Sequence, residues 1–506
     1  MQPSLVSFRA HRFTRYPEVF RAVQHDPLLD TYFDTVAAHE VGWKHKREAL
    51  FDVCCLLTVQ GITLTDLTPQ ALLYHAHESR RLGVSFHPDQ RGSRFAGLTA
   101  WNVLHRMGLL PASVPATIRA ALHRGQRSIE ELVERYPIRN QAVRRLLVDY
   151  LLRRQGDSDY ASVDNLARIL AHLFWQKLEQ LNPDQADLRL PPELYAAWRE
   201  AIRSRDDGTP RSKQDDIVLA VRSFYLDLHT WAAAEPERWA AWVAPCPIPA
   251  SDIRGLGTRR RRINERTADR IRQRQPLLRA LVTHIEDRHE HAKALLTQAQ
   301  ATAPHEQFTL DLDSHLYRRL FGDSERKAAR HQQPAVRVLD QTTGATIHAT
   351  RLEEAAFWDW AVVETLRHTG VRVEELCELT HLSVRQYQRP NGEVVALLVI
   401  APSKTDRERV IPISAELFHV IATIIRRHTH GGRTIPLVSR FDPHDKVWSP
   451  PLPFLFQRQI GSSRAVIAPA TVLNMLRRRC AALAEHNPAF RGIRFTPHDF
   501  RRLLCA

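Results

Sequence analysis

The sequence predicts a mainly α-helical protein with a small antiparallel β-sheet, an α+β arrangement in which helical N-terminal domains precede a mixed C-terminal domain. Helical spacing of apolar residues dominates the chain as far as Glu353. Beyond this point, two apolar runs flank Pro390-Asn391-Gly392, a turn sequence typical of β-hairpins. With 506 residues, of which 43% are hydrophobic, the chain is long enough to form more than one core.

The helical prediction rests on two blocks. In the first, Lys46 to Leu110, the apolar pattern breaks at Gly61 and at Pro88 to Gly92. The second runs from Ile129 to Arg205 and forms two apolar stripes. These stripes consist of Val143, Leu146, Leu147, Tyr150 and Leu151, and of Leu170, Phe174, Trp175 and Leu178.

Turn and linker sequences divide the chain. Asp206 to Pro210 and Pro245 to Pro249 are rich in residues that interrupt regular structure, so we expect boundaries there. The predicted parts are a helical region at 1–128, a helical domain at 129–245, a basic linker with a long helix and an insert at 246–350, and a C-terminal domain at 351–506.

The third part is strongly basic. Its arginines recur every four residues from Arg262 to Arg274, which places them on one helix face. Two interpretations stay open: a solvated helix surface, or a stripe that contacts DNA phosphates. The residues assigned to DNA binding under the second are Arg259, Arg260, Arg261, Arg262, Arg266 and Arg270. Further on, we expect a long helix from Pro276 to Gln300 and a hairpin at Val336 to Thr350 that turns at Gly344.

The C-terminal domain begins with a helix that ends at Gly370, followed by a short helix through Val373, Leu376 and Cys377. Three antiparallel strands are then expected at Leu382 to Gln388, Val394 to Ile400 and Arg409 to Ile413. Helices return after Ser414, a suitable N-cap, and from about Thr471 to Leu483.

The overall charge favours a polyanionic partner. Lys and Arg number 71 against 56 Asp and Glu, which gives a formal charge of +15 and a pI near 9.9. The six cysteines form no C-x-x-C pair, so neither a disulfide framework nor a zinc module is expected. The sequence shows neither a signal peptide nor an apolar run long enough for a membrane span, and we expect a cytoplasmic protein.

Four basic residues stand in separate motifs of the C-terminal domain. They are Arg372 in Thr369-Gly370-Val371-Arg372, Lys404 in Ser403-Lys404-Thr405, and both His498 and Arg501 in Thr496-Pro497-His498-Asp499-Phe500-Arg501. The last motif predicts a helix start, with Thr496 as N-cap, so His498 and Arg501 fall on one face. Guanidinium groups stabilise the charge of a phosphodiester under attack, and their planar shape matches phosphate.

The order of these motifs resembles the catalytic domain of the tyrosine recombinase, or phage integrase, family over Glu353 to Ala506. The resemblance implies a transesterification of DNA through a 3′-phosphotyrosine link, without metal, ATP or another cofactor. It implies that Arg372 and Arg501 clamp the phosphate, that Lys404 protonates the leaving oxygen, and that His498 assists proton transfer or holds the phosphate. It also implies double-stranded DNA as partner, and a dimer or tetramer on DNA for an intact chain. The 129–245 region then resembles a core-binding domain in its position and helical content, and a generic helical domain is the alternative.

The sequence departs from the family at the nucleophile. After Arg501 come five residues without a tyrosine, and the last tyrosine in the chain is Tyr387, in a predicted strand. We therefore expect a recombinase whose sequence, as given, ends before the catalytic tyrosine and which is inactive in this form. Two hypotheses follow: a site-specific recombinase of a mobile element, or a binding module that occupies recombination sites without cutting. A metal-dependent nuclease is disfavoured because no carboxylate cluster accompanies His498.

Overall fold

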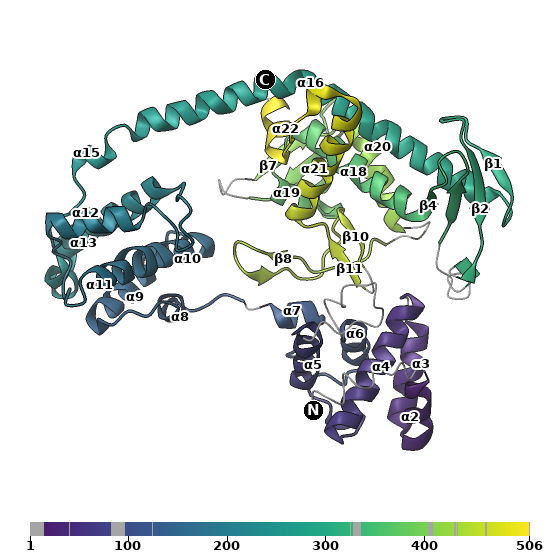
Figure 1. Ribbon diagram of the computed structural model, residues 1–506, viewed down its shortest axis with the longest axis horizontal. Helices are drawn as coiled ribbons and strands as arrows, with labels where there is room; N and C mark the ends of the chain where they lie inside the picture. The colour runs from purple at the N-terminus through teal and green to yellow at the C-terminus, as the bar shows by residue number, and fades with distance from the viewer. Residues whose placement is uncertain are drawn as a thin grey trace. The chain divides into compact units, whose positions relative to one another are not determined.

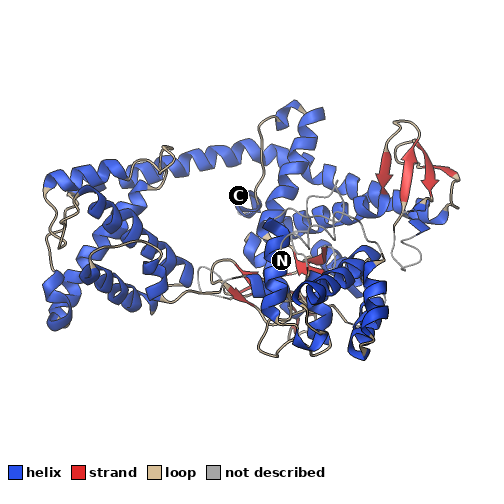
Figure 2. Cartoon of the chain, turned by 60° about the horizontal axis from the view of Figure 1, so that its bottom comes forward, coloured by secondary structure: helices blue, strands red, loops and turns tan. Residues whose placement is uncertain are grey.

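A computed structural model of the protein describes residues 15–39, 41–81, 97–123, 125–323, 325–326, 335–402, 408–429, 432, 434–460 and 463–504 (Figure 1). Helices account for 60% of it, and all sheets are small and antiparallel, which confirms the predicted fold class (Figure 2). By internal contacts the chain forms two units, one of residues 1–123, 270–440 and 448–506, the other of residues 124–269 and 441–447. The four-part division made from the sequence remains a prediction.

The N-terminal part of the first unit is a bundle of short helices with its own core. Gly61, at a φ of 64°, ends α4 in the left-handed conformation, as its place in the sequence predicts. Trp101 and Tyr32 are fully buried in this core. The predicted break at Pro88 to Gly92 lies outside the described residues. The elements are α2 (Tyr16–Gln24), α3 (Pro27–Ala38), α4 (Trp43–Gln60), η1 (Leu64–Asp66), α5 (Pro69–Arg81), α6 (Leu98–Arg106) and α7 (Ile118–Leu122).

The second unit is mainly helical and also includes residues 441–447. All nine residues of the two predicted apolar stripes are buried in one core, which confirms them. Asp206 to Pro210 is a turn, as predicted, but the next helix packs into the same core through Val221 and Phe224, so no boundary falls there. The elements are α8 (Ile129–Glu134), α9 (Gln141–Gln155), α10 (Tyr160–Ala167), the π-helix η2 (Arg168–Gln176), α11 (Lys177–Leu181), α12 (Pro192–Ala201), α13 (Gln214–Ala234), α14 (Pro236–Trp239), η3 (Ala240–Trp242) and α15 (Ala250–Ile253).

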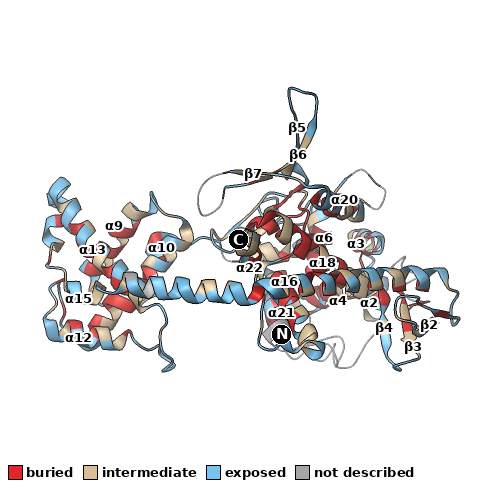
Figure 3. Cartoon of the chain, turned by 90° about the horizontal axis from the view of Figure 1, so that it is seen from above, coloured by how far each residue is buried: buried red, intermediate tan, exposed pale blue. Residues whose placement is uncertain are grey.

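A single helix, α16 (Leu256–Ala301), contains both the arginine-rich segment and the predicted long helix. The expected start at Pro276 is wrong, because the helix passes through this proline. A proline inside a helix costs one backbone hydrogen bond, but helical turns on both sides stabilise this one. The exposed N-terminal half gives way to a half with buried residues, among them Leu281, Val282 and Ile285 (Figure 3).

A four-stranded antiparallel sheet follows α16, in the order β1 (Gln307–Thr309), β2 (Leu316–Leu320), β3 (Arg337–Asp340) and β4 (Thr346–His348). The predicted hairpin is confirmed as β3 and β4, with Gly344 at a φ of 74° in its turn. The sheet packs on Leu295 and Ala299 of α16.

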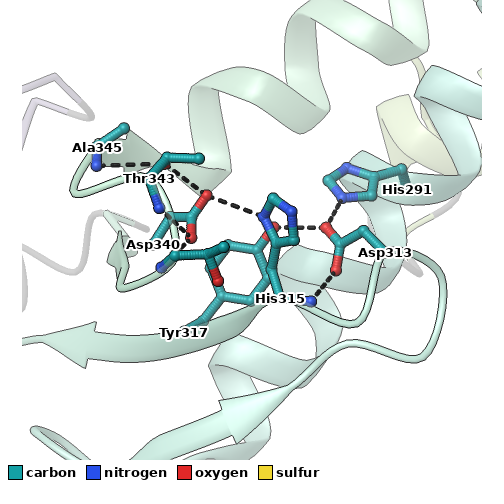
Figure 4. A network of polar contacts seen from close by, with 8 residues as sticks. His291, Asp313, His315, Tyr317, Asp340, Thr343 and Ala345 are labelled. Carbon is teal, nitrogen blue, oxygen red and sulfur yellow. Dashed lines mark hydrogen bonds and ion pairs between the residues drawn. The ribbon is translucent and has the colours of Figure 1, made fainter.

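Polar contacts also join this sheet to α16 (Figure 4). The Asp313 carboxylate, just before β2, accepts a hydrogen bond from the Tyr317 hydroxyl at 2.6 Å and lies 2.6 Å from His291 Nε2 of α16. Beside it, His315 Nδ1 lies 3.0 Å from Asp340 Oδ2 of β3.

The C-terminal part surrounds a core that also includes Leu281, Val282 and Ile285 of α16. Its three-stranded sheet has the predicted order β5-β6-β7, and Leu417 N donates to Ser414 Oγ at 3.3 Å, which confirms the predicted N-cap. The elements are α18 (Ala349–Thr369), α19 (Val373–Glu378), η4 (His381–Ser383), β5 (Val384–Gln388), β6 (Val394–Ile400), β7 (Arg409–Pro412), α20 (Ala415–Thr429), β8 (Phe441–Asp442), β9 (Val447–Trp448), β10 (Gln457–Ile460), β11 (Ser463–Val466), α21 (Pro469–His486), η5 (Pro488–Phe490) and α22 (Pro497–Leu504). None of the described helices combines the length and apolar character that crossing a bilayer requires.

Candidate phosphate-binding site

The turn between α18 and α19 positions Arg372. Gly370, at a φ of 59°, ends α18 in the left-handed conformation and redirects the chain, so that Arg372 becomes the N-cap of α19. Its backbone N donates to Glu375 Oε2 at 2.7 Å, and its Nη1 donates to Glu375 Oε1 at 2.6 Å. The side chain is therefore held against the first turn of the helix that it caps.

Glu375 brings three arginines together. Its side chain is 1% exposed, and it forms ion pairs with Arg372, with Arg409 of β7 and, at 3.8 Å, with Arg501 of α22. The three guanidinium groups share one carboxylate, so the cluster carries an excess of positive charge. Arg501 Nη1 is buried and makes no hydrogen bond within the described part of the chain. A buried donor of this kind is available to an anion that enters the site.

The start of α22 supplies the second half of the site. Thr496 donates from its backbone N and from Oγ1 to Asp499 Oδ2, at 2.8 and 2.7 Å, which fixes the first turn. His498 is exposed, while Asp499 is buried with a side chain 1% exposed. The helix start is therefore anchored on the Asp499 side, and His498 faces the solvent.

Two pKa values in this turn have clear causes. Partial burial lowers the pKa of His498 below its ordinary value of 6.5, and the cations Arg502, Arg501 and Arg270 lower it further, against the effect of Asp499. His498 is therefore neutral at neutral pH and can accept a proton. Burial alone would raise the pKa of Asp499, but hydrogen bonds from Thr496 and Arg274 outweigh it and lower this pKa.

Of the four residues predicted to be catalytic, the structure brings Arg372 and Arg501 together on Glu375 and places His498 at the start of the same helix as Arg501. Lys404 lies outside the described residues. Tyr387 is 52% exposed on β5, where it pairs with Val395.

The residues predicted to bind DNA all lie on α16. Arg261, Arg262 and Arg266 are exposed there, and nothing is described of the side chains of Arg259 and Arg260. Arg270, with a side chain 45% exposed, has its Nη2 3.6 Å from Asp499 Oδ1.

The expectation that the arginine face is open as far as Arg274 was wrong, because Arg274 is only 9% exposed. The i,i+4 spacing gave the helix face correctly, but it could not show that this face becomes buried after Arg270.

Glu375, Arg409 and the contacts of Asp499 were not predicted from the sequence. For Glu375 a signal existed, because an acidic residue three positions after a helix N-cap commonly folds back to the cap. Arg409 carries no such signal, since its role depends on strand pairing that brings β7 next to α19. Among the described residues, no three His, Cys, Asp or Glu side chains gather as they would around a metal ion.

Comparison with known proteins shows which family the sequence around this site is similar to. Searches among curated proteins and among solved structures gave no significant match. A sequence model of the Phage integrase family matches residues 338–506, the segment that contains Arg372, Glu375, Arg409, His498 and Arg501. Over residues 338–506, this chain is therefore similar in sequence to the phage integrase, or tyrosine recombinase, family.

Proposed function

We propose that this chain is a site-specific DNA recombinase by descent and that its C-terminal site binds one phosphodiester of double-stranded DNA. The observation that carries this proposal is the approach of Arg372 and Arg501, from different helices, to the one buried carboxylate of Glu375. Two guanidinium groups held in this way can donate to the non-bridging oxygens of one phosphate. Their hydrogen bonds strengthen as negative charge develops on those oxygens during attack.

The reaction of the family assigns roles to the remaining groups. A tyrosine hydroxyl attacks the phosphorus, the bond to the 5′ oxygen breaks, and a 3′-phosphotyrosine link forms. Neutral His498 accepts the tyrosine proton, and Lys404 donates a proton to the departing 5′ oxygen. A DNA 5′ hydroxyl then attacks the link and reverses these transfers, so no energy source is consumed.

The two functions considered from the sequence, a recombinase and a binding module that does not cut, differ in whether a nucleophilic tyrosine is present. None of the tyrosines in these 506 residues follows Arg501, and Tyr387 lies exposed on β5. We therefore propose that these 506 residues bind recombination sites and hold the phosphate without cutting the strand. Strand transfer, in a dimer or tetramer on DNA, requires a tyrosine brought to the site from elsewhere.

A covalent-trapping experiment tests both the proposed DNA binding and the proposed lack of strand cleavage. The 506-residue chain is mixed with nicked duplexes that carry a randomised core, and DNA binding and detergent-resistant adducts are measured. We expect binding without an adduct. We also expect Arg372→Ala to weaken binding by about tenfold, the effect of one lost charged hydrogen bond of about 1.5 kcal/mol.

The matched control is Arg426→Ala, which removes the same charge from an exposed position on α20. If both variants weaken binding equally, net charge alone explains the effect and the phosphate clamp is refuted. An adduct that disappears in Tyr387→Phe would instead identify Tyr387 as a nucleophile and overturn the proposal of binding without cleavage.

A further inference from the structure

We propose that Arg274 is a positioning residue, which holds the phosphate-binding turn of α22 in place through Asp499. This inference rests on the proposed function, because it concerns how that site keeps its geometry. Arg274 lies on α16, far from α22 in the sequence, yet its Nη1 donates to Asp499 Oδ2 at 2.5 Å. The same oxygen accepts both hydrogen bonds from Thr496 that begin α22. One carboxylate oxygen thus joins α16 to the first turn of α22.

The contact is buried on both sides. Arg274 is 9% exposed, the Asp499 side chain is 1% exposed, and the guanidinium carbon of Arg274 lies 5.9 Å from the centre of the Phe495 ring. Arg274 Nε makes no hydrogen bond within the described part of the chain. The guanidinium group therefore depends on Asp499, whose lowered pKa keeps it ionised at neutral pH. Water screens such a pair little, so its geometry is well defined.

Arg270 is a weaker partner of the same carboxylate. Its Nη2 lies 3.6 Å from Asp499 Oδ1, beyond hydrogen-bonding distance, and its side chain is 45% exposed. Oδ1 itself makes no hydrogen bond among the described residues. We therefore assign the positioning role to Arg274.

The place of Asp499 in α22 explains why this contact matters. His498 and Arg501 are three residues apart and share a helix face, whereas Asp499 points about 100° away from His498, toward α16. A shift of the first turn would move His498 and Arg501 together relative to Arg372. Hydrogen bonds to a phosphate weaken steeply with such shifts, so the site needs a fixed point behind the helix.

The test measures phosphate binding at the site itself. The full chain is labelled at its histidines, the His498 ring signal is assigned by its loss in His498→Gln, and inorganic phosphate is titrated while this signal is followed by NMR. We expect saturable phosphate binding in the unaltered protein. In Arg274→Met we expect binding that is weaker by about threefold or more, which corresponds to the lower end of the interaction energies found between residues of one network. The matched control is Arg279→Met, at an exposed position on the same helix, and it should bind phosphate as the unaltered protein does.

A second variant separates positioning from stability. In the double variant Arg274→Met with Asp499→Asn neither buried charge is left unpaired, so its thermal stability should recover relative to Arg274→Met alone. We expect its phosphate affinity to remain reduced and the pKa of its His498 to fall, since the negative charge of Asp499 that raises it is gone.

If the double variant recovers the phosphate affinity of the unaltered protein, Arg274 serves stability alone and the proposal is overturned. Unchanged affinity in Arg274→Met would overturn it as well. If the unaltered protein does not bind phosphate near His498, it is the proposed phosphate site that fails.

Discussion

Replacing Glu375 by Gln tests whether this carboxylate holds the arginine cluster together. Glutamine keeps the size of the side chain and can still accept a hydrogen bond from the backbone of Arg372, but it removes the negative charge. Arg372, Arg409 and Arg501 would then lie close together without their shared counter-charge. The first turns of α19 and α22 should open more often as a result.

The burial of the four groups sets the size of the effect. Breaking a buried ion pair costs about 3–5 kcal/mol. Here the carboxylate is 1% exposed, but the arginine side chains are 24%, 32% and 27% exposed, so water screens part of their repulsion. We therefore expect a loss of about 2–3 kcal/mol, at or below the lower limit of that range.

Amide hydrogen exchange of the peptides that cover α19 and α22 measures this loss locally and does not require the whole chain to unfold in one step. A loss of 2 kcal/mol corresponds to about 30-fold faster exchange. The matched control is Glu374→Gln, one residue earlier in the same helix turn and half-buried. If exchange accelerates no more in Glu375→Gln than in Glu374→Gln, Glu375 does not hold the arginines together.

Three further predictions concern DNA binding, pH and the turn before Arg372. Arg262→Ala and Arg266→Ala should each lower DNA affinity and reduce the slope of log affinity against log salt by about one, measured by fluorescence anisotropy; unchanged slopes would leave these residues as a solvated surface. The folded protein holds the pKa of His498 below 6.5, so the unfolded chain binds the proton first and stability falls as the pH drops below that value. Urea midpoints measured against pH should fall less steeply in His498→Gln, and an identical slope would count against this. Gly370→Ala forces a side chain into a left-handed conformation at a φ of 59° and should cost about 1–2 kcal/mol in the same urea assay, whereas no loss would mean that the turn adapts.

The sequence predicted most elements of the fold because apolar periodicity and turn residues act locally. The stripe from Val143 to Leu151 is buried as expected, and Pro390-Asn391-Gly392 joins β5 to β6. The extent of α16 was not predictable in this way. Pro276 ordinarily marks a helix start, but in the structure α16 continues through it, and residues beyond it, among them Leu281 and Ile285, are buried in the C-terminal core. Strand β1 was missed because its three residues are too few to show alternation, and β2 because its sequence, Leu-Tyr-Arg-Arg-Leu, does not alternate apolar and polar residues.

The site was predictable to the extent that its residues stand in local motifs. Arg372, His498 and Arg501 follow turns with recognisable capping residues. The contacts of Arg409 with Glu375 and of Arg274 with Asp499 join segments distant in the sequence. No local pattern specifies such pairs, because the tertiary fold creates them.

The most direct test of the account is a double-mutant cycle on Arg372 and Arg501, with binding to duplex DNA measured at fixed salt. If both arginines hold the same phosphate, each alanine variant loses about tenfold in affinity. The loss of binding free energy in the double variant is then smaller than the sum of the two single losses, by at least about 0.5 kcal/mol. The reference cycle pairs Arg372 with Arg262, which lies on α16 and should act independently, so its losses should add. Losses that add equally well for Arg372 and Arg501 would show that they contact separate phosphates, and the shared clamp would be contradicted.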